Sequence, residues 1–192
     1  MKKTTTLFVS MICAATIISL ASCKKDATTP GASESTTSLT VSFSNAAPYT
    51  FFSLKNGSVI PNIDSSTNKW DFGLRRTSFI FNSHAFGLGN AGVIVADGIY
   101  ADITEAPTTG YAYDTTTSKL AVPSYKLWAD YNPATYSFVP KAGKTFIIRT
   151  AEGMYAKMEL LQTIYEPFVG PVPSLITYKL RYTIQANGST KF

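Results

Sequence analysis

Residues 176–184 restrict the fold more than any other stretch, because apolar and polar residues alternate there without a break. Ile176, Tyr178, Leu180, Tyr182 and Ile184 would share one face of an extended strand. A period of two is that of a half-buried β-strand, and no segment keeps a 3.6-residue apolar period for four turns. We therefore expect an all-β fold, built as an antiparallel β-sheet domain.

Further strands are predicted from runs rich in Thr, Val, Ile, Tyr and Phe that end at turn residues. Residues 49–60 contain Asn56-Gly57 between two apolar arms, which indicates a hairpin. Residues 39–45, 70–83 and 92–98 are each predicted as one strand, and residues 144–167 as two strands joined at Glu152-Gly153. The prolines of residues 100–140 predict a loop-rich middle segment.

The N-terminus has the pattern of an export signal rather than of a folded segment. Lys2 and Lys3 precede an apolar run over residues 7–20, which is short for a spanning helix. Leu20-Ala21-Ser22-Cys23 follows and resembles the bacterial lipobox. We expect residues 1–22 to be a lipoprotein signal peptide and Cys23 to carry the lipid; an ordinary secretory signal with a chance cysteine is the alternative.

Residues 23–38 contain no large apolar side chain before Leu39 and predict a flexible tether, which leaves 39–192 as one all-β domain. Cys13 lies in the signal, so the mature chain has neither a disulfide nor a free thiol for catalysis. The formal charge of +5 falls to +3 when Lys2 and Lys3 are removed (5 − 2 = 3). The basic residues are scattered, so we expect no nucleic-acid partner.

Gly87, Gly89 and Gly92 have the G-x-G-x-x-G spacing of dinucleotide-binding loops. That site needs a helix directly after the glycines, whose free N–H groups receive the pyrophosphate. Here a β-branched run ends at Asp97-Gly98 within six residues of Gly92. We interpret the stretch as a turn between strands.

No catalytic constellation emerges, and we expect a binding protein rather than an enzyme. His84 is the only histidine, and no G-x-S-x-G motif accompanies it. Paired carboxylates meeting in space remain open as an alternative, from the set Asp71, Asp97, Asp102, Asp130 and Glu152.

Three stretches occur in order along the chain: Trp70-Asp71 with Arg76, Asn82-Ser83 before the glycine turn, and the run from Arg149 to Lys157. Together they resemble the HmuY family of Bacteroidetes lipoproteins. The resemblance implies an outer-membrane lipoprotein anchored by lipid, with display at the cell surface as an option. It also implies capture of haem for delivery to a TonB-dependent receptor.

The family's better-known members hold iron with a histidine pair or with methionines, and one histidine cannot form such a pair. The resemblance therefore implies haem binding with atypical or absent axial ligation. Tyr131 and Tyr136 are the candidate metal ligands, and the candidate haem contacts are Tyr131, Tyr136, Trp128, Met154, Met158 and His84. For Met154 and Met158 a core position is the alternative. The rival function is a surface interaction module that binds a glycan, peptide or protein partner.

Overall fold

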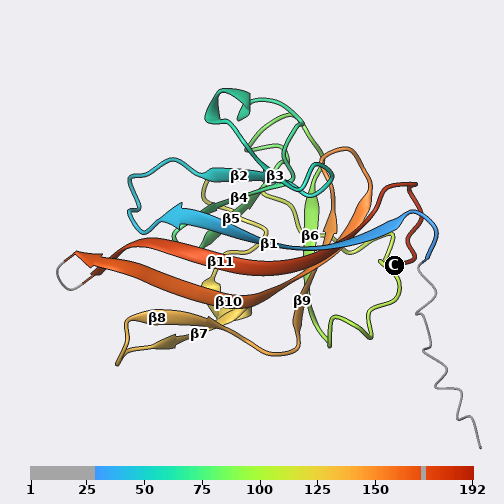
Figure 1. Ribbon diagram of the computed structural model, residues 1–192. Coiled ribbons are helices and arrows are strands. Elements are labelled where there is room, and N and C mark those ends of the chain that lie inside the picture. Colours follow the sequence, from blue (N-terminus) through green and yellow to red (C-terminus); the bar gives the residue numbers. More distant parts are fainter. Residues whose placement is uncertain (1–28, 170–171) are drawn as a thin grey trace, which may run out of the picture.

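The computed structural model describes residues 29–169 and 172–192, which form an all-β structure (Figure 1). The signal peptide and the lipidation site predicted at Cys23 lie outside these residues. The strands are β1 (Ala32–Ser42), β2 (Thr50–Ser53), β3 (Ser58–Ile60), β4 (Phe72–Arg75), β5 (Ser78–Phe81), β6 (Gly92–Asp97), β7 (Ala129–Asn132), β8 (Ser137–Pro140), β9 (Lys144–Arg149), β10 (Tyr155–Val169) and β11 (Val172–Gln185). Two short 3-10 helices are η1 (Asn62–Asp64) and η2 (Tyr125–Leu127). No helix among the described residues has the length and apolar character needed to cross a membrane.

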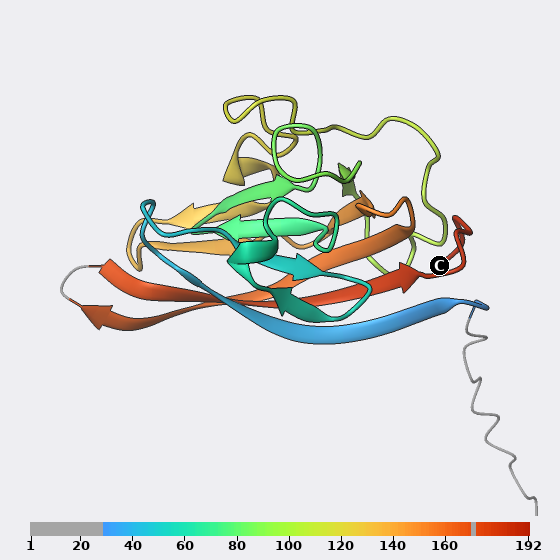
Figure 2. The ribbon, with the colours of Figure 1, turned by 90° about the horizontal axis from the view of Figure 1, so that it is seen from above.

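The largest sheet has the strand order β1-β11-β10-β9-β6, and all of its pairings are antiparallel. The alternating residues of β11 from Ile176 to Ile184 are buried, at 0 to 5% exposure. The alternation predicted from sequence is therefore confirmed. Figures 1 and 2 show β10 and β11 extending past the body of the molecule at the end opposite the C-terminus.

Strand β1 starts at Ala32, so the predicted boundary between tether and domain at Leu39 was wrong. Residues 32–38 pair with β11 from Gln185 to Lys179. Their side chains are mostly exposed hydroxyls, which gave no apolar signal. Backbone hydrogen bonds to a neighbouring strand hold this segment instead, and such bonds do not depend on side-chain type.

A second sheet has the order β3-β2-β4-β5. The predicted hairpin at Asn56-Gly57 is confirmed as β2–β3. Residues 70–83, predicted as one strand, instead form the hairpin β4–β5, in which Arg75 pairs with Ser78. Arg76 adopts φ 51° in the turn. The turn has no glycine or asparagine, and it is held from outside by Tyr178, whose hydroxyl donates to the Arg76 carbonyl at 2.5 Å.

The two sheets enclose an aromatic core. Phe79 of β5 lies 5.1 Å from Phe146 of β9 between ring centroids, and Phe52 of β2 lies 6.1 Å from Tyr182 of β11. The hairpin β7–β8 is a separate two-stranded sheet beside β10. Thr163 of β10 donates to the Phe138 carbonyl at 2.6 Å, which fixes this hairpin to the main sheet.

Candidate functional site

The β7–β8 turn and β10 border an open hollow of about 520 Å³, which we call the hairpin-tip hollow. It is lined by Ala134, Thr135, Tyr136, Ser137 and Tyr165. Most of the lining is apolar, and the volume lies within the range of small-molecule sites. In Figure 1 the β7–β8 turn lies at the end of the molecule opposite the C-terminus.

Tyr136 is the most unusual residue of this hollow. Its φ of 51° lies in the left-handed region, where a bulky side chain is rare and costs about 1 kcal/mol or more. Its side chain is exposed, at 57%. The phenol has no hydrogen-bond partner among the described residues, so its oxygen is free to meet a ligand.

Tyr165 forms the fixed wall of the hollow. Its hydroxyl accepts from the Phe138 N–H at 2.8 Å and donates to the Phe138 carbonyl at 3.1 Å. Burial raises the pKa of this phenol, while the hydrogen bonds to Phe138 act in the opposite direction. The Tyr165 ring is therefore neutral, and its hydroxyl is held by the Phe138 backbone.

A cation lies behind this wall. The Arg76 guanidinium stacks over the Phe43 ring at 4.5 Å, and Phe43 contacts Tyr165 edge-on at 6.5 Å. Arg76 also lowers the pKa of Tyr165 slightly against the effect of burial, which places its charge near that phenol. The Arg76 Nε is buried without a hydrogen-bond partner among residues 29–169 and 172–192. The positive charge favours an anionic group at this end of the protein.

The tyrosines and tryptophan predicted to line one pocket do not all meet. Tyr131 lies on β7 with its ring 5.0 Å from Phe138 and is 41% exposed, but it is not among the residues that line the hollow. Trp128 is a core residue at 1% exposure, packed edge-on against Phe79 at 5.6 Å. The expectation that Trp128 lines a surface pocket is corrected: a ring this large was drawn into the intersheet core.

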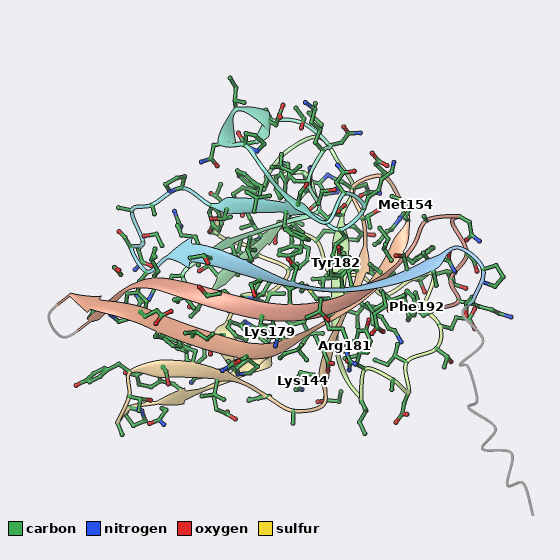
Figure 3. The ribbon with its side chains drawn as sticks, in the orientation of Figure 1. Lys144, Met154, Lys179, Arg181, Tyr182 and Phe192 are labelled. Atoms are coloured by element: carbon green, nitrogen blue, oxygen red, sulfur yellow. The ribbon has the colours of Figure 1, made fainter. Side chains whose placement is uncertain are left out.

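The remaining candidate ligands are dispersed. Met158 is fully buried in the core. Met154 lines a separate hollow of about 90 Å³ near Asp71 and Glu152, and Figure 3 shows it far from the β7–β8 hairpin. His84 is exposed, with φ 32°, and its ring lies 6.1 Å from Tyr113. No group of three or more His, Cys, Asp or Glu side chains suited to a metal occurs within the described part of the chain.

The carboxylates predicted as a possible pair have other roles. Glu152 forms an ion pair with Lys55 at 2.7 Å, Asp130 one with Lys141 at 3.4 Å, and Asp97 one with Lys144. Asp71 and Glu152 share only the small hollow. Its volume of about 90 Å³ is well below that of typical substrate sites, so the geometry offers no room for a sugar ring between them.

The Trp70-Asp71 stretch serves the scaffold. Asp71 is buried, and its two carboxylate oxygens accept from the N–H of Leu54 at 2.7 Å and of Ala151 at 2.9 Å. Burial raises the pKa of Asp71 to about 6, against the lowering effect of these two hydrogen bonds. One side chain thus joins the end of β2 to the β9–β10 turn.

Asn82 has a similar role at the glycine turn. Its amide nitrogen donates to the carbonyls of Thr67 at 2.8 Å and Trp70 at 2.7 Å, and its oxygen accepts from the Gly89 N–H. A Cβ at Gly87 would lie 2.3 Å from the Asn82 oxygen. The glycines therefore permit close approach of the backbone, and β6 rather than a helix follows them, as expected.

Sequence reasoning missed Tyr165 as a wall of the hollow and Arg76 as the cation behind that wall. Tyr165 continues the β10 strand beyond the segment where the alternation was clear, because the register shifts between Leu160 and Gln162. Arg76 was seen only as part of a motif. Neither position could be inferred without knowing that the β4–β5 turn packs near Tyr165 of β10.

Comparison with known proteins yields structures but no sequence match. No family model matches the chain, and no curated protein matches it. The apo HmuY analog TFO of Tannerella forsythia superposes with a TM-score of 0.50 at 16% identity, over 78% of this chain and 96% of that one. Apo PinO from Porphyromonas gingivitis gives 0.49 at 12% identity, over 79% and 99%. A HmuY-like protein from Bacteroides vulgatus gives 0.47 at 14% identity, over 77% and 90%.

These findings define the class of the fold. The chain is an all-β protein with antiparallel sheets and a fold of the HmuY type. At 16% identity the similarity extends to the fold alone, and the site must be argued from this chain's own residues.

Proposed function

We propose that this protein is a cell-envelope lipoprotein of the HmuY family that binds haem in the hairpin-tip hollow and passes it to an outer-membrane, TonB-dependent receptor. The observation that carries the proposal is the strained, exposed Tyr136 at the rim of an apolar hollow of about 520 Å³. Backbone strain of this kind persists where the surroundings enforce it, and it is concentrated at ligand sites.

The residues present fit haem with one protein ligand. Ferric iron accepts tyrosine as an axial ligand, and the Tyr136 phenol is the donor that the hollow offers. Tyr165 supplies a ring wall against which a flat macrocycle can pack, and the charge of Arg76 behind that wall favours anionic propionates at this end of the protein. Met154, Met158 and His84 are not part of this proposal, because none of them lines the hollow.

The direction of display follows from the ends of the chain. Thr29, the first described residue, donates from its side chain to the carbonyl of the C-terminal Phe192 at 2.6 Å. The β7–β8 turn lies at the other end of the molecule (Figure 1). An anchor at Cys23 would therefore hold the C-terminal end near the membrane and point the hollow away from it, toward incoming ligand or a receptor.

A second function is favoured by the exposed side chains of the same hairpin. Tyr131, Tyr136 and Val139 are exposed at 41, 57 and 50%. Exposed apolar and aromatic side chains on one hairpin are typical of interaction surfaces. In this alternative the protein is a surface interaction module for a glycan, peptide or protein partner.

The test is a titration of ferric haem into the chain comprising residues 24–192, followed by visible spectroscopy. We expect a Soret shift at micromolar haem, with the charge-transfer bands of a phenolate-ligated ferric iron. Tyr136→Phe should lose those bands and weaken binding at least tenfold. The matched variants Tyr131→Phe and His84→Ala should keep the bands.

Two outcomes would contradict the proposal. The absence of any Soret shift at micromolar haem would remove the haem function and leave the interaction module. A shift that Tyr136→Phe does not change would move the iron site away from the hairpin-tip hollow.

A further inference from the structure

The edge strand β1 exposes a row of backbone hydrogen-bonding groups. The bonds from Ala186 N to the Gly31 carbonyl and from Phe43 N to the Ser174 carbonyl show that odd-numbered residues face β11. In an antiparallel ladder the residues between them direct both backbone groups to the other side. The N–H and C=O groups of four even-numbered residues therefore point away from β11, in the plane of the sheet and toward its free edge. These residues are Glu34, Thr36, Ser38 and Thr40.

Both ends of this row are closed by the chain itself. The Ala32 N–H donates to the Thr29 carbonyl at 3.0 Å, and the Ser42 carbonyl accepts from the Arg76 N–H at 3.3 Å. Between these two bonds, no partner for the row occurs within residues 29–169 and 172–192. Figure 2 shows β1 along one margin of the molecule. The open part of the edge accepts an extended segment of about seven residues.

A groove of about 220 Å³ lies against the inner face of β1 at this edge. Its wall includes Ser33 and Ser35 from β1, Tyr182 and Ile184 from β11, and Leu54 and Gly57 from the β2–β3 hairpin. Ser33 and Ser35 lie on the edge strand, with their side chains on the same inner face of the sheet as Tyr182 and Ile184. A strand added beside β1 would place the side chain opposite Ser35 into the groove, and a segment that continues past Glu34 would also place one opposite Ser33.

We propose that the β1 edge from Glu34 to Thr40 is a binding site for an extended peptide segment of a partner protein, which joins the sheet as an additional strand. The partner segment alternates apolar residues on the inner face, of which the one opposite Ser35 enters the groove, with polar residues on the outer face. Main-chain hydrogen bonds to the row supply affinity, and the groove selects the alternate side chains. The outer face carries the Glu34 carboxylate, which suits a basic residue at that position.

A peptide fits this edge better than a second copy of the chain. Two β1 strands pairing about a two-fold axis would set Glu34 of one copy against Thr40 of the other. The Thr29–Gly31 turn of each copy would then collide with the Arg76 turn of the other. Both turns occupy the β1 edge, where they bond to Ala32 and Ser42. A short segment without such turns has no conflict of this kind.

The experiment uses residue-resolved amide hydrogen exchange on the full chain in detergent, with the probe peptide Ac-Lys-Val-Thr-Val-Thr-Val-Lys-NH₂. Without peptide, the amides of Glu34, Thr36, Ser38 and Thr40 should exchange rapidly. With peptide, their exchange should slow at least fivefold, and the amides of Thr37 and Leu39 should not change. The same alternation would not result from binding elsewhere on the surface.

Matched peptides and variants separate strand addition from other modes. Methylation of the two Thr amides should abolish binding, because those amides face β1, whereas methylation of the Val amides should not. Ser38→Pro removes one outward N–H at a position where an edge strand tolerates proline, and affinity should fall at least tenfold. Ser38→Ala keeps the N–H and should bind as the natural chain does; a melting curve checks that both variants fold.

Three results would overturn the proposal. One is equal binding of the peptide methylated on threonine. Another is slow exchange of the row in the full chain without peptide, since the edge would then already be covered. The third is a concentration-dependent dimer in sedimentation whose formation slows the same amides, which would make a second copy the occupant.

Discussion

Asn82 accepts a hydrogen bond through its side-chain oxygen from the backbone N–H of Gly89, 2.8 Å away. The same side chain donates to Thr67 and Trp70, so one amide group holds together the loop before β4 and the glycine turn before β6. Asn82 is fully buried, and the arrangement therefore acts as a scaffold. The turn that resembled a nucleotide loop is shaped by this side chain.

Asn82→Ala should lower the free energy of unfolding by about 2–4 kcal/mol, because it leaves buried backbone groups without partners. Urea unfolding at neutral pH measures the change. Asn68→Ala is the control, since Asn68 is exposed and makes no side-chain hydrogen bond among the described residues. A change below 1 kcal/mol for Asn82→Ala would show that the turn forms without the amide.

Gly89→Ala should destabilise the protein through a backbone collision. A Cβ there would lie 2.6 Å from the Ala151 Cβ and 2.8 Å from the Asn82 carbonyl oxygen, so the β9–β10 turn must move. We expect a loss of about 2 kcal/mol or more. Gly98→Ala is the matched control. A Cβ at Gly98 would lie 3.6 Å from its nearest neighbour, the Ile103 side chain, which is an ordinary contact, and stability should change by less than about 1 kcal/mol. Equal effects in thermal melts would contradict the collision.

Asp71 should make the protein less stable as the pH rises. Its pKa is about 6 when folded, against 3.8 for the ordinary value, so between these limits the native state binds more protons than the unfolded state. From pH 4 to 7 its contribution to the unfolding free energy should fall by about 2 kcal/mol. In Asp71→Asn the free energy of unfolding should lose the part of its pH dependence that Asp71 contributes. Urea unfolding of both proteins at pH 4.5 and 7.5 measures the difference. Parallel pH profiles for the two proteins would refute this.

Tyr136→Asn should stabilise the fold and weaken ligand binding together. Asparagine adopts the left-handed region more readily than tyrosine, and the relief is worth about 1 kcal/mol, or roughly 2–4 °C in Tm for a chain of this size. Tyr131→Asn, on a regular strand, should not raise Tm. If Tyr136→Asn lowers Tm, the turn is held by contacts of the phenol ring and the strain carries no functional meaning.

Local patterns predicted the strands with an uninterrupted alternation or a turn dipeptide. In β11, residues 176–184 alternate apolar and polar side chains. Asn56-Gly57 and Glu152-Gly153 mark the turns of the β2–β3 and β9–β10 hairpins. Local patterns failed for β1, whose first residues are mostly polar, and for the β4–β5 turn, where Arg76 has φ 51°. Both depend on partners distant in sequence, β11 for the first and Tyr178 for the second.

The same division applies to the site. Strand alternation is a local property, so the amino-acid order was enough to predict an all-β chain, and the resemblance named Tyr131 and Tyr136 as candidate ligands. That Trp128 and Met158 belong to the core, and that Tyr136 and Tyr165 line one hollow, was settled by the packing of the folded chain. Which aromatic ring is buried depends on the packing of the two sheets, and that packing brings together residues far apart in the chain.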